Sequence, residues 1–76
     1  MRHVTKQVTG VCVSWDPAKG TGILEDDIGN TVHCHKNEIA REFDGSIAPG
    51  TKVKFDLIQR GFYGLGGLRA AKVRPL

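Results

Sequence analysis

Alternation of apolar and polar residues, with no helical repeat, runs through most of the chain. The cleanest case is 51–58, where Val53, Phe55 and Leu57 alternate with lysine and aspartate. This period-two pattern is typical of a strand with one buried face. Other segments are rich in β-branched and aromatic residues. We therefore expect five strands, at residues 7–15, 20–25, 31–35, 51–58 and 68–73.

Turn-forming residues separate these segments. Asp16-Pro17 predicts a turn after the first strand, and the acidic run 26–30 predicts one between the second and third. Residues 36–43 have helix-forming composition but end at Asp44-Gly45, so we expect a single helical turn there. The glycine-rich stretch 61–67 predicts a loop, and 1–6 a loose lead-in.

The length of the chain limits the architecture. Its 76 residues have room for one domain with a small core, and neither an internal repeat nor a linker is apparent. Five short strands leave exposed edges unless the sheet closes on itself. We therefore expect a single all-β domain over 1–76, a five-stranded antiparallel barrel.

Composition narrows the classes of function. Eleven basic and eight acidic residues give a formal net charge of +3, which mildly favours a polyanionic partner. Two cysteines do not make a secreted disulfide scaffold, and no apolar stretch is long enough for a membrane span or signal peptide. We expect an intracellular protein without a membrane partner, in the cytoplasm or, given the basic and acid-free residues 1–6, in an organelle.

Neither a metal site nor a catalytic site is predicted. His33 and His35 would share one face of a strand, whereas Cys34 between them would point to the opposite face. Cys12 and Cys34 fit buried thiols that act as small hydrophobic groups. No serine, histidine and carboxylate arrangement and no phosphate-binding glycine motif is present. We expect no cofactor and no enzymatic activity.

The best candidate for a ligand-facing surface is the predicted hairpin of 20–25 and 31–35. Thr21 and Ile23 would lie on one face of the first of these strands, and His33 and His35 on one face of the second. Gly20 and Gly22 leave the backbone between them open. The pattern predicts a flat, accessible surface.

Several short motifs occur together at spacings that span nearly the whole chain. They are Thr9-Gly10-Val11, Lys19-Gly20-x-Gly22-x-Leu24, Val32-x-x-His35, Ile39, Gly50, Val53, Phe55 and Ala70-Ala71-x-Val73. In this combination they resemble the cold-shock domain, a five-stranded barrel of the oligonucleotide-binding (OB-fold) type. The resemblance implies binding of single-stranded RNA, or single-stranded DNA, with bases stacked on aromatic side chains of the first three strands.

The chain departs from that family where the stacking rings should be. The family typically has phenylalanine at the positions of Thr21, Ile23 and His33, and a tryptophan at the position of Ser14. It also has a phenylalanine at Trp15 and an aromatic residue at Lys36. Because each stacked base contributes about 1–3 kcal/mol, we expect weaker binding unless other groups replace the rings.

Replacement groups can be assigned from the resemblance and from residue type. Trp15 is the best remaining stacking surface, although it could instead close the end of the barrel. His35 matches the family's histidine, and His33 beside it can stack on or hydrogen-bond a base. Lys19 and Lys36 suit phosphate contacts. The further candidates, in and around the glycine-rich loop, are Arg60, Phe62, Tyr63 and Arg69.

A protein-interaction module is the alternative function. The resemblance places Cys12 in the core and leaves Val11 and Val13 on the outer face, where the family carries polar residues. With Ile23 they would form an apolar strip suited to a protein partner, to self-association or to a place within a ribonucleoprotein assembly.

Overall fold

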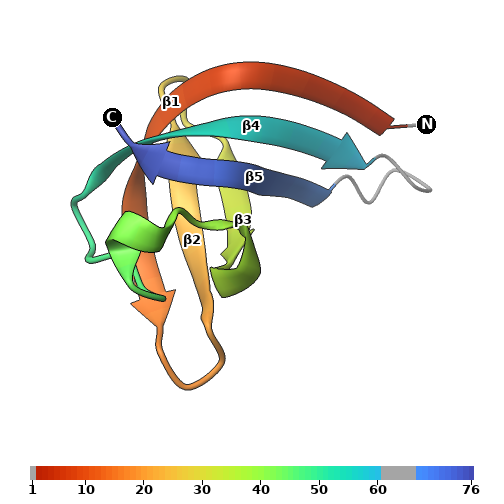
Figure 1. Ribbon diagram of the computed structural model, residues 1–76. Coiled ribbons are helices and arrows are strands. Elements are labelled where there is room, and N and C mark those ends of the chain that lie inside the picture. Colours follow the sequence, from red (N-terminus) through yellow and green to blue (C-terminus); the bar gives the residue numbers. More distant parts are fainter. Residues whose placement is uncertain (1, 61–66) are drawn as a thin grey trace.

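The computed structural model describes residues 2–60 and 67–76, and it is an all-β closed barrel of five strands (Figure 1). The predicted loop residues Phe62 and Tyr63 lie outside this range. Each strand runs close to the segment expected from the sequence: 31–35 is matched at both ends, and the ends of the other strands shift by one to five residues. The elements are β1 (Arg2–Asp16), β2 (Thr21–Asp26), β3 (Thr31–His35), η1 (Lys36–Glu38), η2 (Arg41–Phe43), β4 (Lys52–Arg60) and β5 (Gly67–Pro75).

The barrel is mixed, whereas an antiparallel one was expected. The strands follow the order β1-β2-β3-β5-β4, and β4 pairs with β1 to complete the circle. Four of the contacts between strands are antiparallel, and β3 runs parallel to β5. The parallel contact arises because the chain passes through η1, η2 and β4 between these two strands, and an even number of reversals returns it in the same direction.

The first strand begins at Arg2, so the expectation of a loose lead-in over 1–6 was wrong. Residues 2–5 pair with residues 57–60 of β4, and the two strands extend together beyond the barrel (Figure 1). An irregularity follows between Thr5 and Val8, where Gln7 adopts φ 59°. The buried carboxylate of Asp56 accepts the backbone N–H of Gln7 at 3.2 Å. This hydrogen bond satisfies a backbone donor at the bend.

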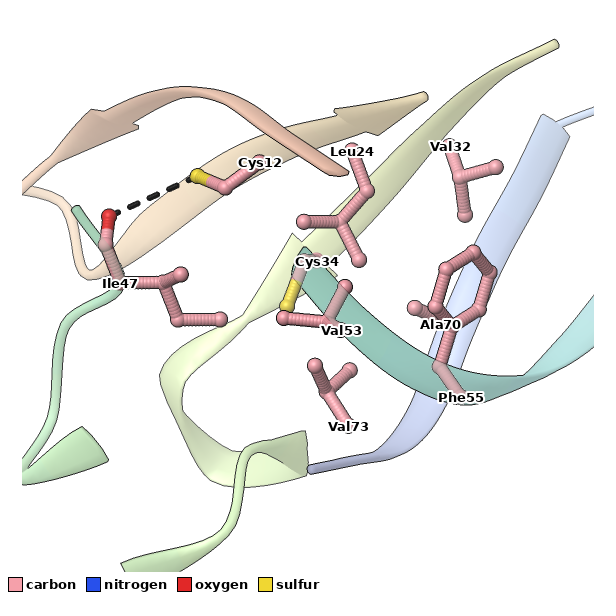
Figure 2. Packing of buried hydrophobic residues seen from close by; sticks show 9 residues of the cluster. All are labelled: Cys12, Leu24, Val32, Cys34, Ile47, Val53, Phe55, Ala70 and Val73. Carbon is pink, nitrogen blue, oxygen red and sulfur yellow. Dashed lines mark hydrogen bonds between the residues drawn. The ribbon is translucent and has the colours of Figure 1, made fainter. Parts of the chain in front are cut away.

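The core contains the residues that the alternation placed inside. Val53 and Phe55 of β4 are fully buried, together with Leu24 of β2 and Val32 of β3 (Figure 2). The complete buried cluster is Cys12, Leu24, Val32, Cys34, Ile47, Val53, Phe55, Ala70 and Val73. These side chains come from all five strands and from the segment before β4, so one core holds the whole barrel together.

Both cysteines are free thiols inside this core, as the sequence predicted. The Cys12 thiol contacts the Ile47 carbonyl oxygen at 3.5 Å (Figure 2). Burial raises the pKa of Cys12, and burial together with the neighbouring Cys12 and Glu38 raises the pKa of Cys34 to about 12. At neutral pH both thiols are therefore protonated and pack as small apolar groups.

Two short 3-10 turns, η1 and η2, occupy the region for which a single helical turn was expected. The break falls at Ile39, which forms an isolated parallel bridge with Val73 of β5, and Ala40 donates its N–H to the Val73 carbonyl oxygen at 2.6 Å. These contacts tie the segment after β3 to β5. Within the described ranges, no helix has the length and apolar character needed to cross a membrane.

The turn between β2 and β3 is organised by Asp26. Its Oδ1 accepts the backbone N–H groups of Ile28 at 3.1 Å and Asn30 at 2.8 Å, and its Oδ2 accepts Asn30 Nδ2 at 2.9 Å. Burial by itself raises the pKa of Asp26, but hydrogen bonds from Asn30, Ile28 and Gly29 outweigh it and lower the pKa below its ordinary value.

The lowered pKa predicts a specific pH dependence of stability. Above about pH 5.5 the carboxylate is charged in both the folded and the unfolded state, and its contribution to stability is complete. As the pH falls through the lowered native pKa, the unfolded state binds more protons and that contribution is lost. We expect Asp26→Asn to be about 1 kcal/mol less stable at pH 7. Its stability should also fall less than that of the native protein below pH 4, measured by urea unfolding.

Glu42→Gln, which changes an exposed carboxylate in η2, is the control. Identical pH profiles of stability for the native protein and Asp26→Asn would show that the Asp26 carboxylate does not stabilise the turn.

Candidate nucleic-acid interface

A groove with a volume of about 580 Å³ opens on the outer surface of the barrel, where the end of β1 lies beside β2, β3 and β5. It contains more than half of the residues proposed from the sequence. Two of the four strands supply the predicted hairpin surface, and β5 contributes a cation. The predicted residues that line the groove are Trp15, Thr21, Ile23, His33, His35 and Arg69.

Strand register explains why these side chains lie together. Ser14 of β1 pairs with Ile23 of β2, Ile23 pairs with His33 of β3, and His33 pairs with Arg69 of β5. Directly paired residues point to the same face with Cβ atoms about 4.5–5.5 Å apart. One row across four strands therefore combines a hydroxyl, an aliphatic group, an imidazole and a guanidinium. A second, parallel row consists of Asp16, Thr21 and His35.

The two histidines face outward and Cys34 faces inward, as strand alternation predicted. His33 is exposed, His35 is half-buried, and Cys34 is buried. His35 Nδ1 accepts the backbone N–H of Asn37 at 3.1 Å and so caps η1. With Nδ1 used as an acceptor, the neutral imidazole carries its proton on Nε2. His35 therefore lines the groove with its ring orientation fixed, and its Nε2–H remains as a hydrogen-bond donor.

A β-bulge in β1 decides where Trp15 lies. The register with β2 shifts between Cys12 and Ser14, so Val13 is an extra residue. After the bulge, Trp15 pairs with Gly22, at an inward-facing position of β2. The indole is half-buried and packs against the core, and any side chain at Gly22 would collide with the ring. Trp15 therefore closes this end of the barrel while still bordering the groove, and it does not lie free on the outer face.

The indole Nε1 of Trp15 is buried and has no hydrogen-bond partner among the described residues. A buried donor without a partner typically costs about 1–3 kcal/mol. The ring is therefore held here by its apolar contacts and by the space that Gly22 leaves open. A glycine is therefore required at position 22 for the Trp15 ring to occupy this place.

Lys19 and Lys36 lie beside the groove but do not line it. Lys19 is exposed in the turn that Asp16 organises, where Asp16 Oδ1 accepts the N–H groups of Ala18 and Lys19. The Lys36 side chain covers Gly20, at which a Cβ atom would lie 2.6 Å from Lys36 Cδ. Gly20 has φ 69°, a conformation that favours glycine. Both lysines are thus neighbours of the groove rather than part of its wall.

The remaining predictions divide between placed and undescribed residues. Arg60 is the last residue of β4, and the structure places its backbone opposite Arg2 and Gly67. Phe62 and Tyr63 fall outside the described residues. In contrast, sequence reasoning missed Ser14, Asp16 and Pro17, which line the groove. Ser14 pairs with Ile23 and Asp16 pairs with Thr21, both of which were predicted surface residues. This pairing could have identified Ser14 and Asp16, but the bulge in β1 changes the register that the sequence suggests.

The expected apolar strip is less continuous than the sequence suggested. Val13 is 51% exposed, whereas Val11 and Ile23 are half-buried. Val11 pairs with Glu25 on one side and with Lys52 on the other. Charged neighbours therefore separate Val11 from a larger apolar patch.

In the described ranges, no three His, Cys, Asp or Glu side chains gather where they could hold a metal ion. Comparison of the chain with protein-family models and with curated proteins found no match.

Proposed function

We propose that this chain is a binding module for single-stranded nucleic acid, chiefly RNA, with little sequence preference and without enzymatic activity. The observation that carries the proposal is the row Ser14–Ile23–His33–Arg69 across the floor of the groove. An apolar surface, an imidazole and a guanidinium are the groups on which unpaired bases stack, and arginine also binds phosphate. The outer face of a small barrel is a common place for such contacts.

The resemblance to the cold-shock domain supports this proposal and also limits the expected affinity. In that family the face carries several rings, and here the corresponding positions include Ser14, Thr21 and Ile23. Smaller side chains account for a hollow where rings would stand. A base would enter this hollow against Ile23 and His33 instead of lying on a flat aromatic platform. With fewer stacks, phosphate contacts carry a larger share of the binding free energy.

Fluorescence of Trp15 gives a direct test, because Trp15 is the only tryptophan and borders the groove. We expect oligo(U) to change its emission, with an affinity that falls steeply between about 50 and 200 mM salt. Oligo(dT) serves as the comparison for DNA. A titration without any change in emission, confirmed by the absence of binding to a labelled oligo(U), would reject the proposed function.

One observation favours the alternative of a protein-interaction module, namely the exposed Val13 beside the groove. A protein partner or a second copy would bury this valine and Ile23. Sedimentation at increasing protein concentration separates the two functions. Self-association that is little affected by salt, together with Trp15 emission that does not respond to oligo(U) at any salt concentration, would support the interaction module. Apolar contacts between protein surfaces are little affected by salt.

A further inference from the structure

A second basic surface lies on the outer side of β4 and β5, away from the groove. Lys52 and Lys54 are two residues apart on β4 and flank the fully buried Val53, so both point outward. Their Cα atoms are separated by about 6.6 Å along the strand. Arg74 of β5 lies directly opposite Lys54. We refer to Lys52, Lys54 and Arg74 as the basic surface.

No carboxylate of the described residues lies directly opposite these cations on a paired strand. On β1, Thr9 lies opposite Lys54 and Val11 lies opposite Lys52. Acidic residues do lie nearby: Asp56 is two positions from Lys54 on β4 but is buried and accepts the Gln7 N–H, Glu38 shares a shallow pocket with Arg74, and Glu25, Asp26 and Asp27 share one with Lys52. Asp27 already accepts a hydrogen bond from the Thr9 hydroxyl.

The arrangement is not explained by folding. Like charges placed directly opposite each other on paired strands destabilise a sheet, and Lys54 and Arg74 form such a pair. Arg74 uses one of its five N–H groups to bind the Lys72 carbonyl oxygen at 2.7 Å, which fixes the side chain along β5. A fixed guanidinium beside two lysines suits a ligand that carries several negative charges.

We propose that the basic surface is a second site for nucleic acid, which it binds through the phosphodiester backbone. The Cα atoms that carry these cations lie about 6.6 Å apart along β4 and about 4.8 Å apart between β4 and β5. Such a repeat fits a chain with one phosphate per nucleotide better than it fits a single anion. None of the three residues is aromatic, so this contact would be independent of base sequence.

The two sites are connected by β5. Arg69 borders the groove and Arg74 belongs to the basic surface, and the five residue steps from one to the other span about 17 Å of strand. A few nucleotides cover this distance, so one long strand can occupy both sites, whereas a short one fills only the groove. The inference does not depend on base binding in the groove, because the basic surface would hold a phosphate backbone without it.

The triple variant Lys52→Gln/Lys54→Gln/Arg74→Gln tests the inference with oligo(U) of about three nucleotides, too short to fill the groove and also reach the basic surface, and of about 24 nucleotides. We expect the affinity for the short oligomer to stay within about twofold and that for the long oligomer to fall about tenfold. The slope of log affinity against log salt for the long oligomer should decrease by about 2, since each lost phosphate contact contributes about 0.7. Unchanged affinity and slope for the long oligomer would overturn the proposal.

Matched variants distinguish a local site from a general effect of net charge. Arg74→Gln should reduce the salt slope for the long oligomer, and Arg41→Gln, which removes the same charge from exposed η2, should not. Lys54→Gln should keep or raise the melting temperature, because it relieves the repulsion with Arg74.

Two further outcomes have a defined meaning. If the triple variant lost binding to phosphatidylserine vesicles but kept its affinity for long oligo(U), the surface would be assigned to membranes and this inference would be rejected. If short oligo(U) fails to bind the native protein but long oligo(U) binds through these three residues, the groove proposal fails and this one stands.

Discussion

The double variant His33→Ala/Arg69→Ala should bind oligo(U) about 10- to 100-fold more weakly than the native protein while remaining folded. The two residues are cross-strand neighbours at the centre of the groove, and both are exposed, so their removal leaves the core intact. Under the proposed function, the change removes one stacking surface and one phosphate contact. A loss of about 1.4–2.8 kcal/mol corresponds to this range of affinity. Fluorescence anisotropy with a labelled short oligomer measures the effect.

A matched control removes the same kinds of group outside the groove. Asn37→Ala/Arg41→Ala deletes one neutral polar side chain and one arginine from the exposed turns η1 and η2. We expect this variant to bind within about twofold of the native protein. If the two double variants bound equally well, the groove would not be the site of nucleic-acid binding.

The substitution Gly22→Ala should lower the free energy of unfolding by about 1–3 kcal/mol, the usual cost of overpacking a well-filled site. A Cβ atom at Gly22 would collide with the Trp15 ring and would lie 2.8 Å from the Ser14 carbonyl oxygen. The ring has to move, and it would lose contacts with the core. Thermal unfolding should therefore begin several degrees earlier, and Trp15 emission should shift to longer wavelength.

Gly67→Ala provides the control for this prediction. Gly67 is also a strand residue, at the start of β5, and a Cβ atom there would meet no atom of the described residues within 4 Å. Alanine loses less backbone entropy on folding than glycine, so Gly67→Ala should leave the stability unchanged or slightly raised. If Gly22→Ala unfolded at the same temperature as Gly67→Ala, the contact between Trp15 and Gly22 would not constrain the barrel.

Much of the fold could be predicted because alternation is a local property of strands. Val53 and Phe55 in the core, and Cys34 inward between the outward histidines of β3, were expected from neighbouring residues alone, whereas the resemblance placed Cys12 in the core. Because the short strands could cover their edges only by closing, the barrel was also expected. Its parallel contact between β3 and β5 was not, since no local pattern reports which strands meet.

What the sequence concealed were features that depend on a partner strand. Residues 2–5 are mostly polar and gave no strand signal, yet they pair with the end of β4. The bulge at Val13 shifts the alternation of β1 by one residue. A regular strand with Cys12 inside would place Ser14 inside and Trp15 outside, and the bulge reverses both. The groove therefore has Ser14 on its floor and the tryptophan at its edge.

The position of His33 opposite Arg69 also affects how the barrel holds together. The parallel contact of β3 with β5 consists of this pair, and the bridge of Ile39 with Val73 follows further along the chain. A ligand that touches both His33 and Arg69 would bridge β3 and β5 where the barrel is closed by the fewest paired residues, and it would hold the two strands together. Because such a ligand contacts both strands only when they are paired, its binding would oppose local separation of β3 from β5.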